Sequence, residues 1–288
     1  MKKLSILTLL MLLFATQASA ENDVQKEKVV TSSFSFIAGD ATITDHYMSD
    51  QEYTGPIMGA GMKFGSFYKK SSNLSWDIDL TYLAASYTPY ATDVCIGNPA
   101  RTSFYDVKHL NADYGTYYNW NPIKNLHIKV GGSFDLLMGM ILGQPNHINN
   151  AVDLDFQTQL KAAAGIQYGW YFKNFGISLQ ADIAVPFMGL ALSSGKFEAS
   201  YDSFMGDILP GSMNPISFTS FHNLQGFNTE IEADFIFKKT TIFLSMEYNN
   251  RWWNMHEVQN YRKYSLTRIG IKLDLVSRNR VNSNNKYF

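Results

Sequence analysis

The sequence predicts an all-β fold, a ten-stranded antiparallel transmembrane β-barrel. Three observations indicate this class: an export leader, ten long segments of alternating apolar and polar residues, and connections that alternate in length. Of the 288 residues, 17% are charged and 15% are aromatic, a composition that excludes an intrinsically disordered chain. Outside the leader, no apolar run reaches the roughly 18 residues that a membrane-spanning helix needs.

The first 20 residues have the three parts of a signal peptide. Two lysines form a basic start, residues 4–15 form a short apolar core, and small residues at 18–20 precede a cleavage site. We expect cleavage after Ala20, because the apolar core is too short for a membrane anchor. Export would leave a periplasmic N-terminal segment at 21–30, the transmembrane barrel at 31–276 and a periplasmic C-terminal tail at 277–288.

Ten segments alternate apolar and polar residues with a period of two, which gives each strand one face of each kind. In the third segment, for example, Trp76 and Leu80 lie on the face opposite to Asp77. These segments exceed the about 5–6 residues of a typical soluble strand, and their length suits tilted strands across a bilayer. A soluble secreted β-sandwich, with shorter strands and closer turns, is the alternative fold. The expected spans are 31–43, 56–68, 74–87, 102–119, 126–141, 156–172, 176–192, 223–237, 240–253 and 262–276.

The connections between these segments alternate between short and long, as they do in barrels with short periplasmic turns and long extracellular loops. An even number of strands places both chain ends on the periplasmic side. Short connections are expected at 69–73, 120–125, 173–175 and 238–239, and long ones at 44–55, 88–101, 142–155, 193–222 and 254–261.

Aromatic residues gather toward both ends of the expected strands, where amphipathic rings favour the boundary between lipid and water. The alternative is that aromatic residues are simply good strand formers. The expected girdles contain Tyr117, Tyr118, Trp120, Trp170, Tyr171 and Phe172 near short turns, and Tyr87, Tyr90, Trp252 and Trp253 toward the long loops.

Taken together, the leader, the ten segments and the connection pattern resemble the bacterial outer-membrane β-barrels, over residues 31–276. The resemblance implies insertion into the lipid of a Gram-negative outer membrane by the barrel-assembly machinery, for which Phe288 resembles the terminal aromatic signal. The polar residues before Phe288 depart from the usual alternation. The size is similar to the omptin proteases, but the local motifs of that family and of outer-membrane phospholipases and lipid A deacylases are missing.

Charged side chains on the polar faces of the segments would line the lumen. They either form a charge network that fills a narrow interior, or serve as a cation-preferring channel or an acid/base site. The expected network comprises Lys63, Asp77, Asp79, Lys129, Asp135, Lys161, Glu230, Glu232, Asp234, Glu247, Arg251, Arg268, Lys272 and Asp274, with His109, Asp113, His127 and Asp182 as further inward candidates.

Three acids in the eighth segment, Glu230, Glu232 and Asp234, alternate with apolar residues and would face the lumen together. Because like charges repel, we expect them to pair with bases, and they are the candidates if the lumen were catalytic. The expected bases are Lys272, Arg268, Arg251 and Lys161. Glycines on polar faces would leave room for such long inward side chains, or mark bulges. These glycines are Gly59, Gly61, Gly65, Gly165 and Gly169.

The remaining candidates lie in loops. The lone Cys95 cannot form an internal disulfide, and it is either a reactive thiol or an incidental loop residue. His46, His147, His222 and His256 fall on different loops without ligand spacing, so we expect no metal site. The apolar loop 193–222 would pack on the barrel mouth or bind a ligand or partner.

The sequence therefore favours a non-enzymatic outer-membrane barrel of structural, binding or narrow-pore type, without a cofactor. The alternative is an outer-membrane hydrolase, either a protease or a lipid-modifying enzyme, with an acid/base site in the lumen or at the extracellular rim. No nucleophile, base and orienting group stand out together in the sequence. The formal net charge of −1 gives no basic surplus, so no nucleic-acid partner is expected.

Overall fold

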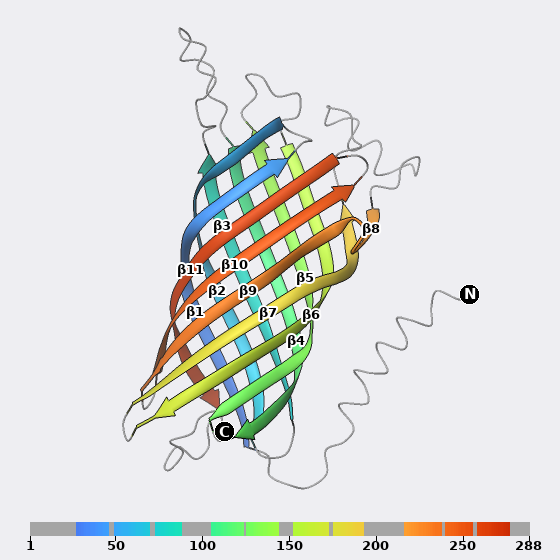
Figure 1. The fold of residues 1–288 in the computed structure, drawn as a ribbon. Coiled ribbons are helices and arrows are strands. Elements are labelled where there is room, and N and C mark those ends of the chain that lie inside the picture. Colours follow the sequence, from blue (N-terminus) through green and yellow to red (C-terminus); the bar gives the residue numbers. More distant parts are fainter. Residues whose placement is uncertain are drawn as a thin grey trace, which may run out of the picture.

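The computed structural model is a closed β-barrel with steeply tilted strands (Figure 1). It describes residues 27–45, 49–69, 73–87, 105–123, 125–143, 152–172, 175–192, 216–237, 240–255 and 258–276. Within these ranges there is no helix with the length and hydropathy needed to cross a membrane. Cys95, Tyr90, Phe288 and the histidines 46, 147 and 256 lie outside the described residues, as do the leader and the C-terminal tail.

The described residues form eleven strands, of which ten build the barrel wall and one short strand adds to its rim. The strands are β1 (Glu27–Asp45), β2 (Ser49–Lys69), β3 (Leu74–Tyr87), β4 (Tyr105–Ile123), β5 (Leu126–Gly143), β6 (Val152–Tyr171), β7 (Gly176–Leu192), β8 (Ile216–Ser220), β9 (Leu224–Ile236), β10 (Thr240–Met255) and β11 (Val258–Val276).

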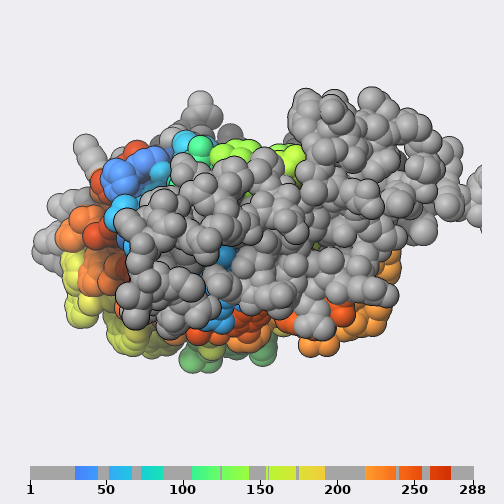
Figure 2. All heavy atoms as spheres, turned by 90° about the horizontal axis from the view of Figure 1, so that it is seen from above, coloured from blue at the N-terminus to red at the C-terminus, as the bar shows by residue number. Residues whose placement is uncertain are grey.

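Antiparallel pairing of neighbouring strands closes the wall. β1 pairs with β2 on one side and with β11 on the other, so that Phe36 lies between Ala60 and Ile269. In the view from above, residues from the start and the end of the chain accordingly lie side by side (Figure 2). β1 begins and β11 ends at the same end of the barrel, here called the terminal end, and the opposite end is called the loop end.

The predicted barrel fold is confirmed, and the strands differ from the expected spans mainly in length. β3 and β7 have the expected limits, whereas β1 begins at Glu27, inside the segment expected to precede the barrel. Two connections expected to be long, at 44–55 and 254–261, are short. In the first, β1 ends at residue 45 and β2 begins at 49, and in the second, β10 ends at residue 255 and β11 begins at 258. Inside the expected loop 193–222, residues Ile216–Ser220 form β8, which pairs with β7.

The period-two alternation places apolar side chains outside and most charged ones inside. Phe36, Met58, Ile231 and Met246 are each 63–66% exposed on the outer surface, although they are large and apolar. Exposed apolar side chains of this size cover the wall of a membrane barrel because lipid surrounds it.

The aromatic residues divide between the girdle and the interior. Tyr118, Trp120, Trp170 and Phe172 are exposed at the terminal end, and the ring of Phe172 stacks on that of Phe175, with 6.2 Å between the centroids. Three expected girdle residues point inward instead, because they have the opposite parity along their strands: Tyr117, Tyr171 and Trp253. The side chain of Tyr87 is outside the described residues.

At the loop end the alternation is inverted relative to the membrane-facing wall. Outward residues such as Asp40, Thr54 and Ser265 are polar and exposed. Many of the buried inward residues on β11 and β1–β5 are apolar and form what we call the inner apolar cluster. Strands that project beyond lipid need this arrangement, with water outside and a packed core inside. The cluster comprises Ile37, Ala41, Ile43, Tyr53, Ile57, Leu83, Val107, Ile141, Tyr264 and Leu266.

Candidate functional site: the charged lumen

The described charged residues expected to line the lumen all lie at inward positions of their strands, below the inner apolar cluster. The side chain of Asp274 lies outside the described residues. Many of these side chains are almost completely buried, including Asp135, Lys161, Glu232, Asp234 and Arg251. Buried charges must be paired or hydrated, so their contacts decide what the lumen can do.

One group of ion pairs includes contacts between strands that are not neighbours in the wall. Arg251 Nη2 on β10 lies 2.8 Å from Asp135 Oδ2 on β5. Lys161 on β6 lies 3.6 Å from the other oxygen of Asp135 and forms a second, closer pair with Asp113 on β4. Ser133 donates a hydrogen bond to Asp113. Two acids and two bases are thereby joined in one buried chain.

A second crossing is centred on Arg268 of β11. Its Nη2 lies 2.6 Å from Glu247 Oε2 on the adjacent strand β10, and its Nη1 lies 3.1 Å from Asp79 Oδ2 on β3. One guanidinium group therefore bridges two carboxylates from different parts of the wall, a geometry that the five donors of arginine permit.

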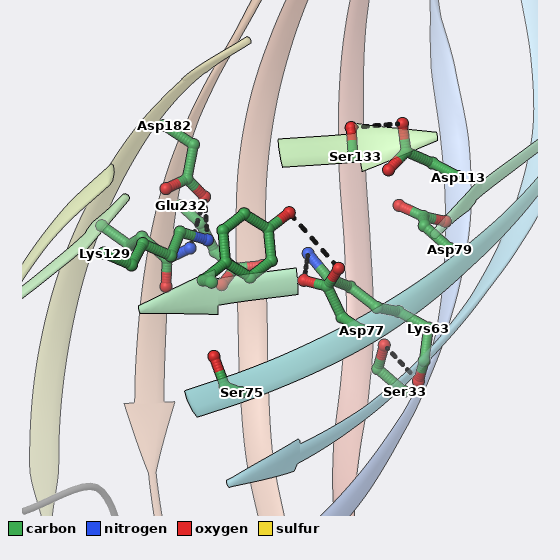
Figure 3. A network of polar contacts seen from close by, with 12 residues as sticks. Ser33, Lys63, Ser75, Asp77, Asp79, Asp113, Lys129, Ser133, Asp182 and Glu232 are labelled. Atoms are coloured by element: carbon green, nitrogen blue, oxygen red, sulfur yellow. Dashed lines mark hydrogen bonds and ion pairs between the residues drawn. The ribbon is translucent and has the colours of Figure 1, made fainter. Parts of the chain in front are cut away.

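Toward the terminal end, two further ion pairs lie on opposite sides of the view in Figure 3. Lys129 Nζ on β5 lies 3.0 Å from Asp182 Oδ2 on β7, and Gln180 donates to the same carboxylate oxygen. A Cβ atom at Gly165, on the strand between them, would collide with both partners. The absence of a side chain there makes the pair possible.

Lys63 of β2 and Asp77 of β3 form the other pair, with 3.8 Å between Nζ and Oδ2. Tyr117 donates a hydrogen bond of 3.4 Å to Asp77 Oδ1, and the Lys129 ammonium lies 4.8 Å from the centre of the Tyr117 ring. Tyr117 thus contacts both ion pairs that Figure 3 shows. It lies in the lumen and not in the expected girdle because its position along β4 faces inward.

The acidic triplet of β9 faces the lumen, and two of its acids form ion pairs with Lys272, one of the four expected bases. Lys272 Nζ lies 2.6 Å from Glu232 Oε1 and 2.8 Å from Asp234 Oδ1. The other three bases are taken by acids on β3, β4, β5 and β10. Glu230 lies farther along β9, where it lines the mid-depth cavity together with Lys63 and Arg268.

The space between these side chains is small. A cavity of about 80 Å³ lies toward the terminal end, and a second of about 90 Å³ lies at mid-depth. Lys63, Asp77, Tyr117 and Lys129 line both. Cavities of this size hold a few water molecules, whose share of liquid volume is about 30 Å³ each.

At the loop end, Arg262, His109 and Tyr264 form a buried hydrogen-bonded group that the sequence analysis did not predict. Arg262 Nη1 lies 3.1 Å from His109 Nε2, and His109 Nδ1 lies 2.8 Å from the Tyr264 hydroxyl. Because arginine can only donate, His109 accepts at Nε2 and donates from Nδ1. The Arg262 guanidinium also lies 5.0 Å from the centre of the Trp253 ring. Arg262 shares the parity of Arg268, which could have identified it as inward.

Trp253 belongs to a smaller apolar cluster with Ala191 and Leu224, at the same end of the barrel. With the inner apolar cluster, it supplies buried apolar side chains from β1–β5, β7 and β9–β11. Arg262 connects the two clusters through Trp253. The lumen is thus mainly apolar at the loop end, where a cavity of about 40 Å³ lies beside Leu83, Tyr264 and Leu266, and polar toward the terminal end.

Reactive groups are scarce among the described residues. No group of three or more His, Cys, Asp or Glu residues there is placed to hold a metal ion. A serine and a histidine do meet outside the lumen, where Ser220 and His222 share a short hydrogen bond in the turn between β8 and β9. Within the described chain, no acidic side chain is bonded to His222 as an orienting group. Sequence reasoning missed this pair, whose i, i+2 spacing was its only signal.

The family of the chain follows from its sequence. A family model described as "Protein of unknown function (DUF3316)" matches residues 4–279. The chain belongs to the DUF3316 family. No curated protein matches it.

The barrel is also similar to solved structures of low sequence identity. The outer membrane protease OmpT from Escherichia coli is 6% identical over 88% of this chain and 99% of that chain, with a TM-score of 0.43. The transport unit of the autotransporter AIDA-I from Escherichia coli is 10% identical over 90% and 97%, with a TM-score of 0.40. Ail, the attachment invasion locus protein of Yersinia pestis, is 8% identical over 86% and 99%, with a TM-score of 0.34. These similarities concern the fold alone.

Proposed function

We propose that this protein is a non-enzymatic outer-membrane barrel of structural or binding type, with a lumen closed to solutes. On this proposal the signal peptide is removed after Ala20, the terminal end faces the periplasm and the loop end faces outward. The barrel then serves as a rigid scaffold that acts through its outer wall and its loop end. The single observation that carries the proposal is the packed interior at the loop end.

Packing and pairing support closure in two successive layers. At the loop end, Ile57, Val107 and Ile141 are each 1% exposed within the inner apolar cluster. Below it, Arg251 and Arg268 reach acids on other parts of the wall. A solute would have to displace both a close-packed apolar layer and buried ion pairs, each of which is costly.

The electrostatics also favour a structural role for the charges over selectivity. A conducting filter needs charged groups that meet passing ions along a wetted path. Here the carboxylates of Asp79, Asp135 and Glu232 are engaged by bases within 3.1 Å. Their charge is compensated inside the wall, which suits a network that fills a narrow barrel.

Liposome swelling tests the proposal. Refolded full-length protein in phosphatidylcholine vesicles is diluted into an isotonic arabinose solution, with a porin in matched vesicles as the positive control. We expect vesicles with this protein to swell no faster than empty vesicles. Swelling at a rate that rises with the amount of inserted protein would overturn the closed lumen and establish a pore.

The second candidate function is hydrolysis at the loop end, favoured by the hydrogen bond between Ser220 and His222. A histidine in contact with a serine can act as the base that activates it as a nucleophile. A fluorophosphonate probe tests this function, with Ser220→Ala as the control. Labelling of the native chain that disappears in Ser220→Ala would establish the hydrolase. If the native chain and Ser220→Ala are both labelled only at the background level, the hydrolase is contradicted and the scaffold role stands.

A further inference from the structure

The cavity of about 40 Å³ at the loop end is surrounded mainly by positive charge. Three arginine side chains line it, Arg251 from β10 and both Arg262 and Arg268 from β11, and each is at most 9% exposed. Among the described lining residues, Glu247 supplies the one carboxylate. His109 also lines the cavity, but it accepts a hydrogen bond from Arg262 at Nε2 and is therefore uncharged.

Two side chains of β10 bring N–H groups without an acceptor to this cavity. Arg251 donates through Nε to Asn249 Oδ1 and through Nη2 to Asp135, while its Nη1 is buried without a hydrogen-bond partner among the described residues. Asn249 lies two residues earlier on the same inward face, and no acceptor in the described chain is bonded to its Nδ2. Arg251 and Asn249 both line the cavity and are more than nine-tenths buried. Buried donors are costly when they are unpaired, so we expect an acceptor between them.

The walls of the cavity strengthen its attraction for an anion. Leu83 and Leu266 of the inner apolar cluster line one part of it, and Arg268, which already bridges Glu247 and Asp79, lines another. Charges attract more strongly beside apolar walls, because little water is present to screen them. The volume suits one small occupant, since a water molecule takes about 30 Å³ in the liquid.

We propose that this cavity binds a single chloride ion. The ion accepts from Arg251 Nη1 and Asn249 Nδ2, and the guanidinium groups of Arg262 and Arg268 add to its attraction. Charge-assisted hydrogen bonds of this kind are stronger than neutral ones. Chloride is slightly larger than water and carries the charge that the surrounding arginines favour.

A water molecule is the rival occupant of the cavity. It can accept from the same two donors and donate to Asn111 Oδ1, which lines the cavity and is buried without a partner in the described chain. Asn111 also lines the mid-depth cavity, so water in that larger space can donate to it while chloride occupies the smaller one. Water has no charge to offset the arginines, and this difference separates the two occupants by experiment.

Equilibrium unfolding tests whether a halide occupies the site. Refolded full-length protein in detergent micelles is unfolded by urea in sodium chloride, sodium bromide or sodium gluconate at equal ionic strength. Gluconate is too large for the cavity. We expect the unfolding equilibrium constant to be about tenfold lower when chloride is at about ten times its dissociation constant, because the ion binds the folded chain alone. Bromide should act in the same way. Equal stability in chloride and gluconate would overturn the site and favour water.

Two facing asparagines provide matched variants. Asn249 on β10 lies opposite Asn228 on β9, but Asn228 lines the mid-depth cavity and not this one. We expect Asn249→Leu to weaken chloride binding about tenfold, because the site loses a hydrogen-bond donor, and Asn228→Leu to leave it unchanged. The general effect of the salts on folded protein acts on both variants and cancels in the comparison. Equal chloride dependence of the two variants would overturn the site.

Diffraction from the native chain keeps the proposal falsifiable if Asn249→Leu fails to fold. Protein refolded in sodium bromide is crystallised, and data are collected at the bromine absorption edge. We expect an anomalous peak inside the cavity, in contact with Arg251 Nη1 and Asn249 Nδ2. A cavity without such a peak would refute the site. The site lies beyond the scaffold role and does not depend on a closed lumen, so vesicle swelling and these measurements can fail independently.

Discussion

Arg251 on β10 and Asp135 on β5 meet across the lumen, with 2.8 Å between Nη2 and Oδ2, although 116 residues separate them in sequence. Asp135 is completely buried. Neither strand neighbours the other in the wall, so this contact ties opposite parts of the barrel together. It also places a salt bridge where an open pore would need a passage.

Removing one member of this pair should destabilise the barrel strongly. Arg251→Ala removes the closest base of the buried Asp135 carboxylate, and breaking a buried ion pair by removing one partner costs about 3–5 kcal/mol. We expect the temperature at which the folded gel band disappears in detergent to fall clearly. An unchanged midpoint would show that the carboxylate is hydrated and that the lumen is wetter than its packing indicates.

The double variant Arg251→Met with Asp135→Leu provides the control for this pair. Replacing both charges by apolar groups of similar size is often neutral, because no charge is left unpaired. We expect its midpoint to lie above that of either single variant. A double variant that is as unstable as the sum of the singles would mean that the pair contributes through packing alone.

Glu232→Gln tests whether the acidic triplet is structural. Lys272 loses its 2.6 Å partner and keeps Asp234 at 2.8 Å, so we expect a loss of about 1.5–3 kcal/mol, the range for a hydrogen bond to a charged group. The heat-modifiable gel midpoint measures it. Glu52→Gln, at an exposed position, is the control and should leave the midpoint unchanged. A midpoint of Glu232→Gln that stays or rises would favour a catalytic role for the triplet.

Arginine substitutions test which side of the wall faces lipid. Ile166 is 49% exposed on the outer surface, and Leu136 shares the outward side of β5, whereas Gln167 is 8% exposed in the lumen. Ile166→Arg and Leu136→Arg should each impair insertion into vesicles, at about 2–4 kcal/mol for a mid-depth cation. Gln167→Arg should insert much better, because it lines a polar cavity. Equal folded fractions for all three would contradict the assigned faces.

Gly165→Ala should lower stability because its new methyl group would collide with Asp182 and with Lys129. We expect a cost of about 1–3 kcal/mol, the usual range for overpacking. Gly132→Ala is the matched control, since its Cβ faces outward and meets only the carbonyl oxygen of Lys161, at 3.1 Å. Similar midpoints for the two variants would mean that the ion pair moves aside without loss.

Local periodicity was sufficient to predict the strands of this barrel and the inward side of its charges. The limits of β3 and β7 were predictable because turn residues flank them and the alternation stops sharply. β8 was missed because five residues between a loop and a turn give no periodic signal, and only pairing with β7 makes them a strand.

Contacts across the lumen were beyond sequence reasoning for a geometric reason. The partner of an inward charge depends on strand tilt and register around the whole wall, so Glu232 and Asp234 of β9 pair with Lys272, whereas Arg268 bridges Glu247 and Asp79. The inner apolar cluster was missed for a related reason. The lumen was expected to be lined by charged side chains of the polar faces, and only the folded barrel brings inward apolar residues such as Ile57 and Val107 into one buried cluster at its loop end.

Single-channel recording tests closure of the lumen most directly. The refolded full-length protein is inserted into a planar phosphatidylcholine bilayer in potassium chloride, and insertion is verified by its heat-modifiable band. With the packed cluster at the loop end and the Arg251–Asp135 pair below it, we expect no current steps above the bare bilayer. Discrete steps proportional to voltage, with a preference for cations, would contradict closure and make the acidic lumen a channel.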